Sequence, residues 1–273
     1  MTLGDMISAE QLLDHLVRSV VGGQLELVDL SHPLTDTTPM IQLPPPLVEA
    51  PGWTLKEIAR YNAAGPMYYW NAFEGSEHMG THFDAPVHWI TGKDGLDVSQ
   101  IPVADLIGPA VVIDRTAEAA SNADYLLTVD DILEFEESNG PLPKGGWLLL
   151  RTGWAMRHAE PERFVNAVGD GSHWPGMTVE CAQHLAHETA ITGYGVEHIG
   201  IDWGMAHTLD PMYPAHHFLL GAGKFGLASL AQLDRLPVVG SVLVAAPLRI
   251  VRGSGSPARV FALVARDGPT VAG

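Results

Sequence analysis

The chain has 273 residues, is 46% hydrophobic and carries a formal net charge of −17 at pH 7. This composition supports a single domain over residues 1–273, because no linker, internal repeat or low-complexity stretch divides it. The acidic balance excludes nucleic acid as a partner, since no basic surface would offset phosphate repulsion. The sequence has no apolar run of about eighteen residues and no secretory signal. We therefore expect a cytoplasmic protein that neither spans nor binds a membrane.

The first predicted element is an amphipathic helix within residues 1–23. Ser8 can cap its N-terminus, and Gly22 followed by Gly23 can end it. Its apolar stripe consists of Leu12, Leu13, Leu16, Val17 and Val20. We expect this stripe to pack on the protein itself or on a partner subunit.

The rest of the chain alternates apolar runs with helical patterns. Strands are predicted at residues 25–30, 67–73, 111–113, 147–151, 199–201, 243–246, 248–251 and 260–265. Helices are predicted at 129–138 and 178–188, and residues 31–66 are rich in loop signals. The single cysteine, Cys181, excludes an intrachain disulfide and is expected as a small buried side chain. This alternation indicates an α/β protein with a mixed central sheet.

The strongest functional signal is the segment SEHMGTHFDAPVHW at residues 76–89. Its candidate metal ligands are His78, His82, Asp84 and His88. Imidazoles and carboxylates are the donors that borderline divalent metals prefer. A helix cannot gather them, because Asp84 would lie roughly 200° from His82 at about 100° per residue. A straight strand would spread the four over about 33 Å. We therefore predict an extended segment that bends at Gly80 and Pro86 around a metal ion, with a histidine-rich turn as the alternative.

The motif HMGTHFDAPVH (78–88) resembles the HxGTHxDxPxH signature of the metal-dependent cyclase-like amidohydrolases. The segments that extend the resemblance over roughly residues 25–265 include LVDLSHPL (27–34), GWLLLRTGW (146–154), GIDWGMAH (200–207) and AHHFLLGAG (215–223). The resemblance implies a swivelling β/β/α arrangement. It also implies that a metal-activated water attacks an amide carbonyl.

The resemblance also implies roles for individual residues. His78, His82 and Asp84 would hold one divalent ion, with Mn²⁺ favoured and Zn²⁺ as the alternative. His88 would be the general base with an ordinary pKa near 6.5, or else a structural residue. His216 would be a further histidine of the centre, with its neighbour His217 as the rival.

Four more residues are candidates for contact with the substrate or for support of the metal ligands. Phe73 and Trp89 would line a flat aromatic pocket, although aromatic residues are more often part of a core. Asp202 would hold a loop by hydrogen bonds. Ser229 would support the metal ligands or relay protons.

Dinuclear members of the family carry a glutamate ligand twelve residues after the histidine that His216 matches, and the same count gives Ala228 here. Alanine cannot coordinate, so we expect one ion and a likeness to the branch of the family that hydrolyses isatin, a small aryl lactam. The alternatives are an arylformamidase that cleaves N-formylkynurenine, a non-haem iron oxygenase, and a metal-dependent sensor without turnover. Family members are often dimers or tetramers, which implies a homodimer or homotetramer.

Overall fold

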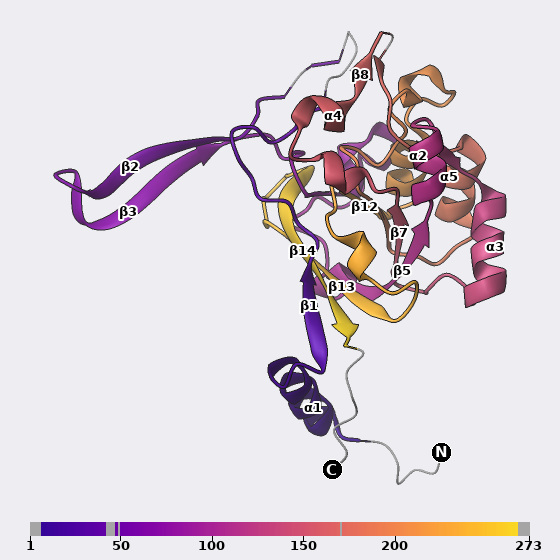
Figure 1. The fold of residues 1–273 in the computed structure, drawn as a ribbon, viewed down its shortest axis with the longest axis horizontal. Coiled ribbons are helices and arrows are strands. Elements are labelled where there is room, and N and C mark those ends of the chain that lie inside the picture. The colour runs from indigo at the N-terminus through magenta and orange to yellow at the C-terminus, as the bar shows by residue number, and fades with distance from the viewer. Residues whose placement is uncertain (1–6, 42–46, 49, 170, 267–273) are drawn as a thin grey trace.

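The computed structural model describes residues 7–41, 47–48, 50–169 and 171–266. The strands of its main sheet are β1 (Leu25–Asp29), β4 (His82–Asp84), β5 (Ile107–Asp114), β7 (Trp147–Arg151), β11 (Gly193–Val196), β12 (Phe225–Ala228), β13 (Ser241–Pro247) and β14 (Gly255–Ala265). They lie in the order β1-β14-β13-β5-β7-β11-β12-β4, and β14 also pairs with β4. This second pairing closes the sheet into a barrel (Figure 1). The prediction of one α/β domain with a mixed sheet is confirmed, because β5, β7, β11 and β12 are parallel while the other pairings are antiparallel.

The remaining elements surround this barrel or project from it. The α-helices are α1 (Ala9–Val21), α2 (Thr116–Ser121), α3 (Val129–Asn139), α4 (Pro161–Val165) and α5 (Val179–His187), and a π-helix spans His216–Leu220. The smaller strand pairs are β2 (Thr54–Asn62) with β3 (Gly65–Glu74), β6 (Leu126–Leu127) with β10 (Gly176–Met177), and β8 (Ala167–Val168) with β9 (Gly171–Ser172). Within the described residues, no helix is both long and apolar enough to cross a bilayer.

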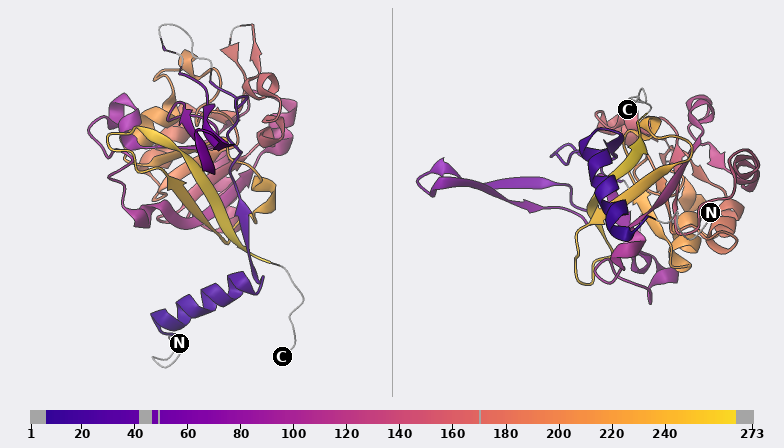
Figure 2. Two further views of the ribbon diagram at one scale, coloured as in Figure 1. Left: turned by 90° about the vertical axis from the view of Figure 1, so that its left-hand side faces the viewer. Right: turned by 90° about the horizontal axis from the view of Figure 1, so that it is seen from below.

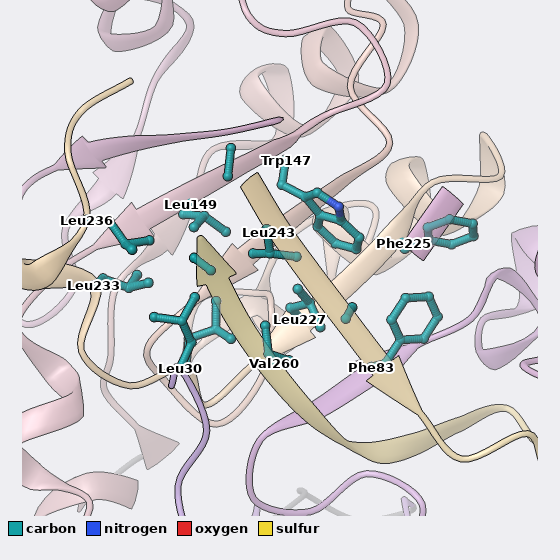
Figure 3. Close-up of a cluster of buried hydrophobic side chains, with 14 of the residues drawn as sticks. Leu30, Phe83, Trp147, Leu149, Phe225, Leu227, Leu233, Leu236, Leu243 and Val260 are labelled. Carbon is teal, nitrogen blue, oxygen red and sulfur yellow. The ribbon is translucent and has the colours of Figure 1, made fainter. Parts of the chain in front are cut away.

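The apolar runs of the central strands are continuous because both faces of the sheet are buried. Along β7, Trp147 and Leu149 point into the barrel, where they join the cluster drawn in Figure 3. Leu148 and Leu150 point to the opposite face and pack in a second cluster with residues of α3 and α5. Cys181 of α5 belongs to this second cluster and is fully buried, as predicted. The barrel therefore gives β4, which lies within the functional segment and pairs with β12, a rigid support.

Three sequence predictions are wrong. Residues 54–62, expected as loop, form strand β2, because they pair with β3 across a two-residue turn. Residues 199–201, expected as a strand, form bends. The strand of this region is β11, and its two glycines interrupt the apolar pattern that predicts a strand. Residues 248–251 form part of a turn, closed by a hydrogen bond from the amide of Gly253 to the carbonyl of Ile250.

Gly193 is required by the close approach of β11 to β7. A Cβ atom there would lie 2.3 Å from the Trp147 ring and 2.8 Å from the Phe225 carbonyl oxygen. We expect Gly193→Ala to lower the free energy of unfolding by about 1–3 kcal/mol, because the core would have to shift. Urea unfolding measures this change, with Gly52→Ala as the control, since the Cβ of that variant would meet, among the described residues, only Met40 Cγ, at 3.6 Å. Equal stability of the two variants would contradict the packing argument.

Two elements project from the body. Helix α1 begins at the predicted cap, where Ser8 and Gln11 form reciprocal hydrogen bonds, and lies apart from the barrel (Figure 2). Its apolar stripe stays exposed, with Leu13 at 62% and Val17 at 60% of their free area. The β2–β3 hairpin extends as a long arm on another side (Figure 1). The body of this chain therefore does not cover the α1 stripe, which leaves a partner subunit as the expectation.

Candidate metal centre

The segment that carries the histidine motif bends as its sequence requires. Gly80 has a φ of +53°, and a Cβ atom at this position would lie 2.6 Å from Leu34 Cδ2. Glycine is therefore the residue that fits both the backbone and the space. After the three residues of β4, Pro86 opens a 3₁₀ turn that ends at His88. The two bends bring side chains together that a straight strand would keep apart.

His78, His82 and Asp84 form a compact group of donors. One ligand atom from each lies within 4.8 Å of the others. His78 Nδ1 is 2.7 Å from Asp84 Oδ1, and His82 Nε2 is 3.4 Å from the same oxygen. Asp84 is 1% exposed, and its Oδ2 is buried without a hydrogen-bond partner among the described residues. A buried carboxylate oxygen without a partner is costly, so these residues fit a divalent cation.

The electrostatics of the group also favour a cation. Burial raises the pKa of the Asp84 carboxyl, but the imidazoles of His82 and His78 outweigh burial and hold that pKa well below its usual range. Burial lowers the pKa of His82, so its imidazole is neutral. His82 Nδ1 lies 2.8 Å from the Gly80 carbonyl oxygen, which can only accept, so Nδ1 carries the proton. The lone pair of His82 Nε2 therefore faces Asp84.

His216 lies on the other side of Asp84 and is held by Asp202. Its Nε2 is 3.9 Å from Asp84 Oδ2, and its Nδ1 is 2.5 Å from Asp202 Oδ2. Asp202 also accepts the backbone amides of Ala215 and His216, so it orders the start of the π-helix as well. Burial lowers the pKa of His216, but the hydrogen bond and charge of Asp202 prevail and raise it. His217 does not line this cavity, and its carbonyl accepts the Thr91 hydroxyl.

His88 packs against the candidate metal ligand His78. Its ring stacks on that of His78 with centroids 3.7 Å apart, and its centroid lies 5.4 Å from that of His216. Burial, followed by the neighbouring His78, lowers the pKa of His88 to about 3. This value is well below the ordinary one expected from the sequence. The imidazole is therefore neutral at physiological pH.

His78, His82 and His88 line a cavity of about 290 Å³, and Asp84 lies buried behind the two ligand histidines. The aromatic residues that line it are Trp89, Trp174, Trp203 and Tyr213. The indole N–H of Trp174 donates to the Asp202 carbonyl, and that of Trp203 donates to the Asp124 carboxylate. These bonds fix two of the indole rings as flat apolar walls. The sequence analysis did not predict Trp174, Trp203 or Tyr213 as cavity residues. The one local clue is that Trp203 directly follows the candidate residue Asp202 in the segment GIDW.

Two candidates from the sequence lie away from this cavity. Phe73 is on the β3 arm, 62% exposed, and stacks on Trp53 with ring centroids 4.9 Å apart. Ser229 follows β12, where its neighbour Ala228 pairs in register with His82. Its carbonyl accepts the Thr81 hydroxyl at 2.5 Å, so Ser229 braces the metal-binding segment through its backbone.

Comparisons with known proteins agree with this geometry. A family model described as putative cyclase matches residues 28–203. The isatin hydrolase of Roseibium aggregatum is 42% identical over 261 residues, which cover 94% of this chain and 99% of that protein. A kynurenine formamidase of Salinibacter ruber is 30% identical over 198 residues, which cover 71% of this chain and 78% of that protein.

Solved structures give the same result. The crystal structure of an isatin hydrolase bound to the product analogue thioisatinate matches with a TM-score of 0.93 at 42% identity, covering 95% of this chain and 100% of that chain. Isatin hydrolase A from Ralstonia solanacearum matches with a TM-score of 0.90 at 41% identity, covering 95% of this chain and 98% of that chain. The resemblance read from the histidine motif is confirmed over most of the chain.

Proposed function

This chain belongs to the putative cyclase family, and from that premise we propose that it is a metal-dependent hydrolase that opens the lactam ring of isatin to isatinate. The observation that carries the proposal is the buried group of His78, His82 and Asp84 at an aromatic-walled cavity. A flat aryl lactam matches these walls, and its amide carbonyl can reach the donors. The 42% identity to an isatin hydrolase supports the same substrate class.

His78 Nδ1, His82 Nε2 and an oxygen of Asp84 would hold the ion. When bound, a divalent ion lowers the pKa of water and polarises a carbonyl oxygen. Trp89 forms part of the cavity wall beside His88 and His216, with its ring 5.0 Å from that of His216. The indole of Trp89 and the imidazoles of His88 and His216 would orient the substrate and exclude bulk water from its amide group.

His88 is placed to move the proton that the reaction requires. The oxygen of water forms a bond to the lactam carbonyl carbon, and His88 accepts the proton that water loses. The carbon–nitrogen bond then breaks, and His88 returns the proton to the departing nitrogen. The products are a carboxylate and an aryl amine within one molecule, and one proton is released to solvent.

A single ion per chain, with Mn²⁺ favoured over Zn²⁺, is part of the proposal. Ala228 lies opposite His82 in the β12–β4 pairing and is fully buried, so it supplies a methyl group where dinuclear relatives are expected to have a carboxylate. Among the described residues, His78, His82 and Asp84 form the one group of three or more such donors. This arrangement disfavours a second ion.

Turnover of isatin and of N-formylkynurenine, measured side by side on protein reconstituted with Mn²⁺ or Zn²⁺, tests the substrate. We expect isatin to be the preferred substrate. Preference for N-formylkynurenine would overturn the assignment in favour of the formamidases, which are also similar to this chain. If the protein binds metal but turns over neither substrate, the result would favour a binding protein without catalytic activity.

A homodimer or homotetramer is also proposed, from the exposed apolar surfaces of α1 and of the β2–β3 arm. On the arm, Met67 is 88% exposed and Trp70 is 53% exposed. Contiguous apolar surface of this kind marks an interface. We expect the double variant Leu13→Asp, Val17→Asp to lower the molar mass in light scattering. Val251→Asp is the matched control, because Val251 is 73% exposed on a turn of the body, and an unchanged mass of the α1 variant would exclude α1 from the interface.

A further inference from the structure

We propose that Glu77 and Ser254 position His78 for the metal, by keeping its proton on Nε2 and leaving Nδ1 free to bind. The inference rests on the metal site proposed above and adds two residues to it. His78 Nε2 lies 2.8 Å from Ser254 Oγ. Ser254 Oγ in turn lies 2.6 Å from Glu77 Oε2, which also accepts the Ser254 amide at 3.0 Å.

The number of available protons sets the direction of this chain of hydrogen bonds. The Glu77 carboxylate can only accept, so the single hydroxyl proton of Ser254 points to Glu77. Ser254 Oγ is then an acceptor toward His78, which must donate from Nε2. With a cation bound, Nδ1 would therefore carry no proton and would offer its lone pair to the ion, beside the ligand oxygen Asp84 Oδ1, which lies 2.7 Å away. The negative charge of Glu77, relayed through the hydroxyl, also makes Nδ1 a stronger donor to a cation.

The turn between β13 and β14 is shaped to deliver Ser254 to this point. Gly255 follows it, and a Cβ atom there would lie 2.5 Å from His78 Cε1 and 2.3 Å from the Phe83 carbonyl oxygen. A Cβ atom at Gly253 would lie 3.0 Å from Glu77 Oε1. A side chain at Gly255 would push the turn away from His78. Two glycines therefore allow Ser254 to approach an imidazole that lies 176 positions earlier in the chain.

The other histidines of the centre are held in the same manner by other groups. His82 donates from Nδ1 to the Gly80 carbonyl, and His216 is bonded at Nδ1 to Asp202. His78 differs because its partner is a neutral hydroxyl, which could either donate or accept. Glu77 removes this ambiguity. Loss of such an outer partner commonly weakens metal affinity by about 10–100-fold.

Calorimetric titration of metal-free protein with Mn²⁺ tests the inference without any substrate. Ser254→Ala and Glu77→Ala should each weaken Mn²⁺ binding by about 10–100-fold. The double variant should be no weaker than Ser254→Ala alone, because the two residues act in series. Ser256→Ala is the matched control, since this buried serine lies two residues further on, in β14, and accepts the Leu248 amide, with no hydrogen bond to His78 among the described residues.

The Nε2 proton of His78, observed by NMR in the diamagnetic Zn²⁺-loaded protein, gives a second readout. In the wild type this proton should be hydrogen-bonded to Ser254 Oγ, shifted downfield and slow to exchange with solvent, and Glu77→Ala should weaken both signatures. Wild-type affinity and an unchanged Nε2 proton in both single variants would overturn the inference while leaving the metal site standing. A wild-type protein that binds no Mn²⁺ would overturn the proposed function itself. Equal loss in Ser256→Ala would assign the effect to the turn and not to the hydroxyl.

Discussion

Replacing Asp84 by Ala is expected to abolish metal binding and, with it, hydrolysis of isatin. Asp84 supplies the only carboxylate of the described donor group, and its Oδ1 lies within 3.4 Å of both His78 Nδ1 and His82 Nε2. Without it, the cation would lose its anionic ligand in a buried place where water cannot replace the charge. Metal analysis of the dialysed variant and its isatin turnover measure the two effects. Both should fall to background.

Asp94→Ala is the control for this substitution, because Asp94 is an exposed carboxylate ten residues further along the same segment. It should keep both metal and turnover. Near-native circular dichroism of the Asp84 variant would show that the loss arises at the site. A correctly folded Asp84→Ala protein that retains one tightly bound ion would contradict the ligand assignment.

Replacing His88 by Ala is expected to retain the metal and to reduce turnover by about a hundred-fold or more, which is the usual contribution of a general base. His88 stacks on the ligand His78 and, among the described residues, makes no hydrogen bond to the donor atoms, so its removal leaves the three donors in place. Its lowered pKa keeps the ring neutral at neutral pH. Steady-state turnover and Mn²⁺ titration separate the two properties.

His184→Ala controls for the removal of an imidazole, since His184 lies on helix α5, outside the residues that line the cavity. It should leave both turnover and Mn²⁺ affinity unchanged. If His88→Ala loses its metal instead, His88 is a ligand and another residue must take the proton.

The metal-binding segment could be predicted from the sequence because its parts are local. Three candidate donors and the proposed base lie within eleven consecutive residues, and Gly80 and Pro86 mark where the chain has to bend. Geometry alone therefore excluded both a straight helix and a straight strand. The capped α1 helix and the apolar strand β7 were equally accessible, since each depends on neighbours in the sequence.

The rest of the site depends on contacts between distant segments, which no local pattern encodes. Trp174 reaches the cavity because its indole bonds to the carbonyl of Asp202, 28 positions later. Ser254 meets His78 only because β14 pairs with β4 and closes the barrel. Strand β11 was not predicted for a related reason. The close packing of Trp147 requires glycine at Gly193, and glycines interrupt the apolar pattern that predicts a strand.

The central claim is that one ion, held by His78, His82 and Asp84, supports hydrolysis of isatin. The most direct test is to titrate metal-free protein with Mn²⁺ while isatin turnover is followed. Turnover should rise from background and reach its plateau at one ion per chain. A plateau reached only at two ions per chain, or turnover that does not respond to added metal, would contradict the claim.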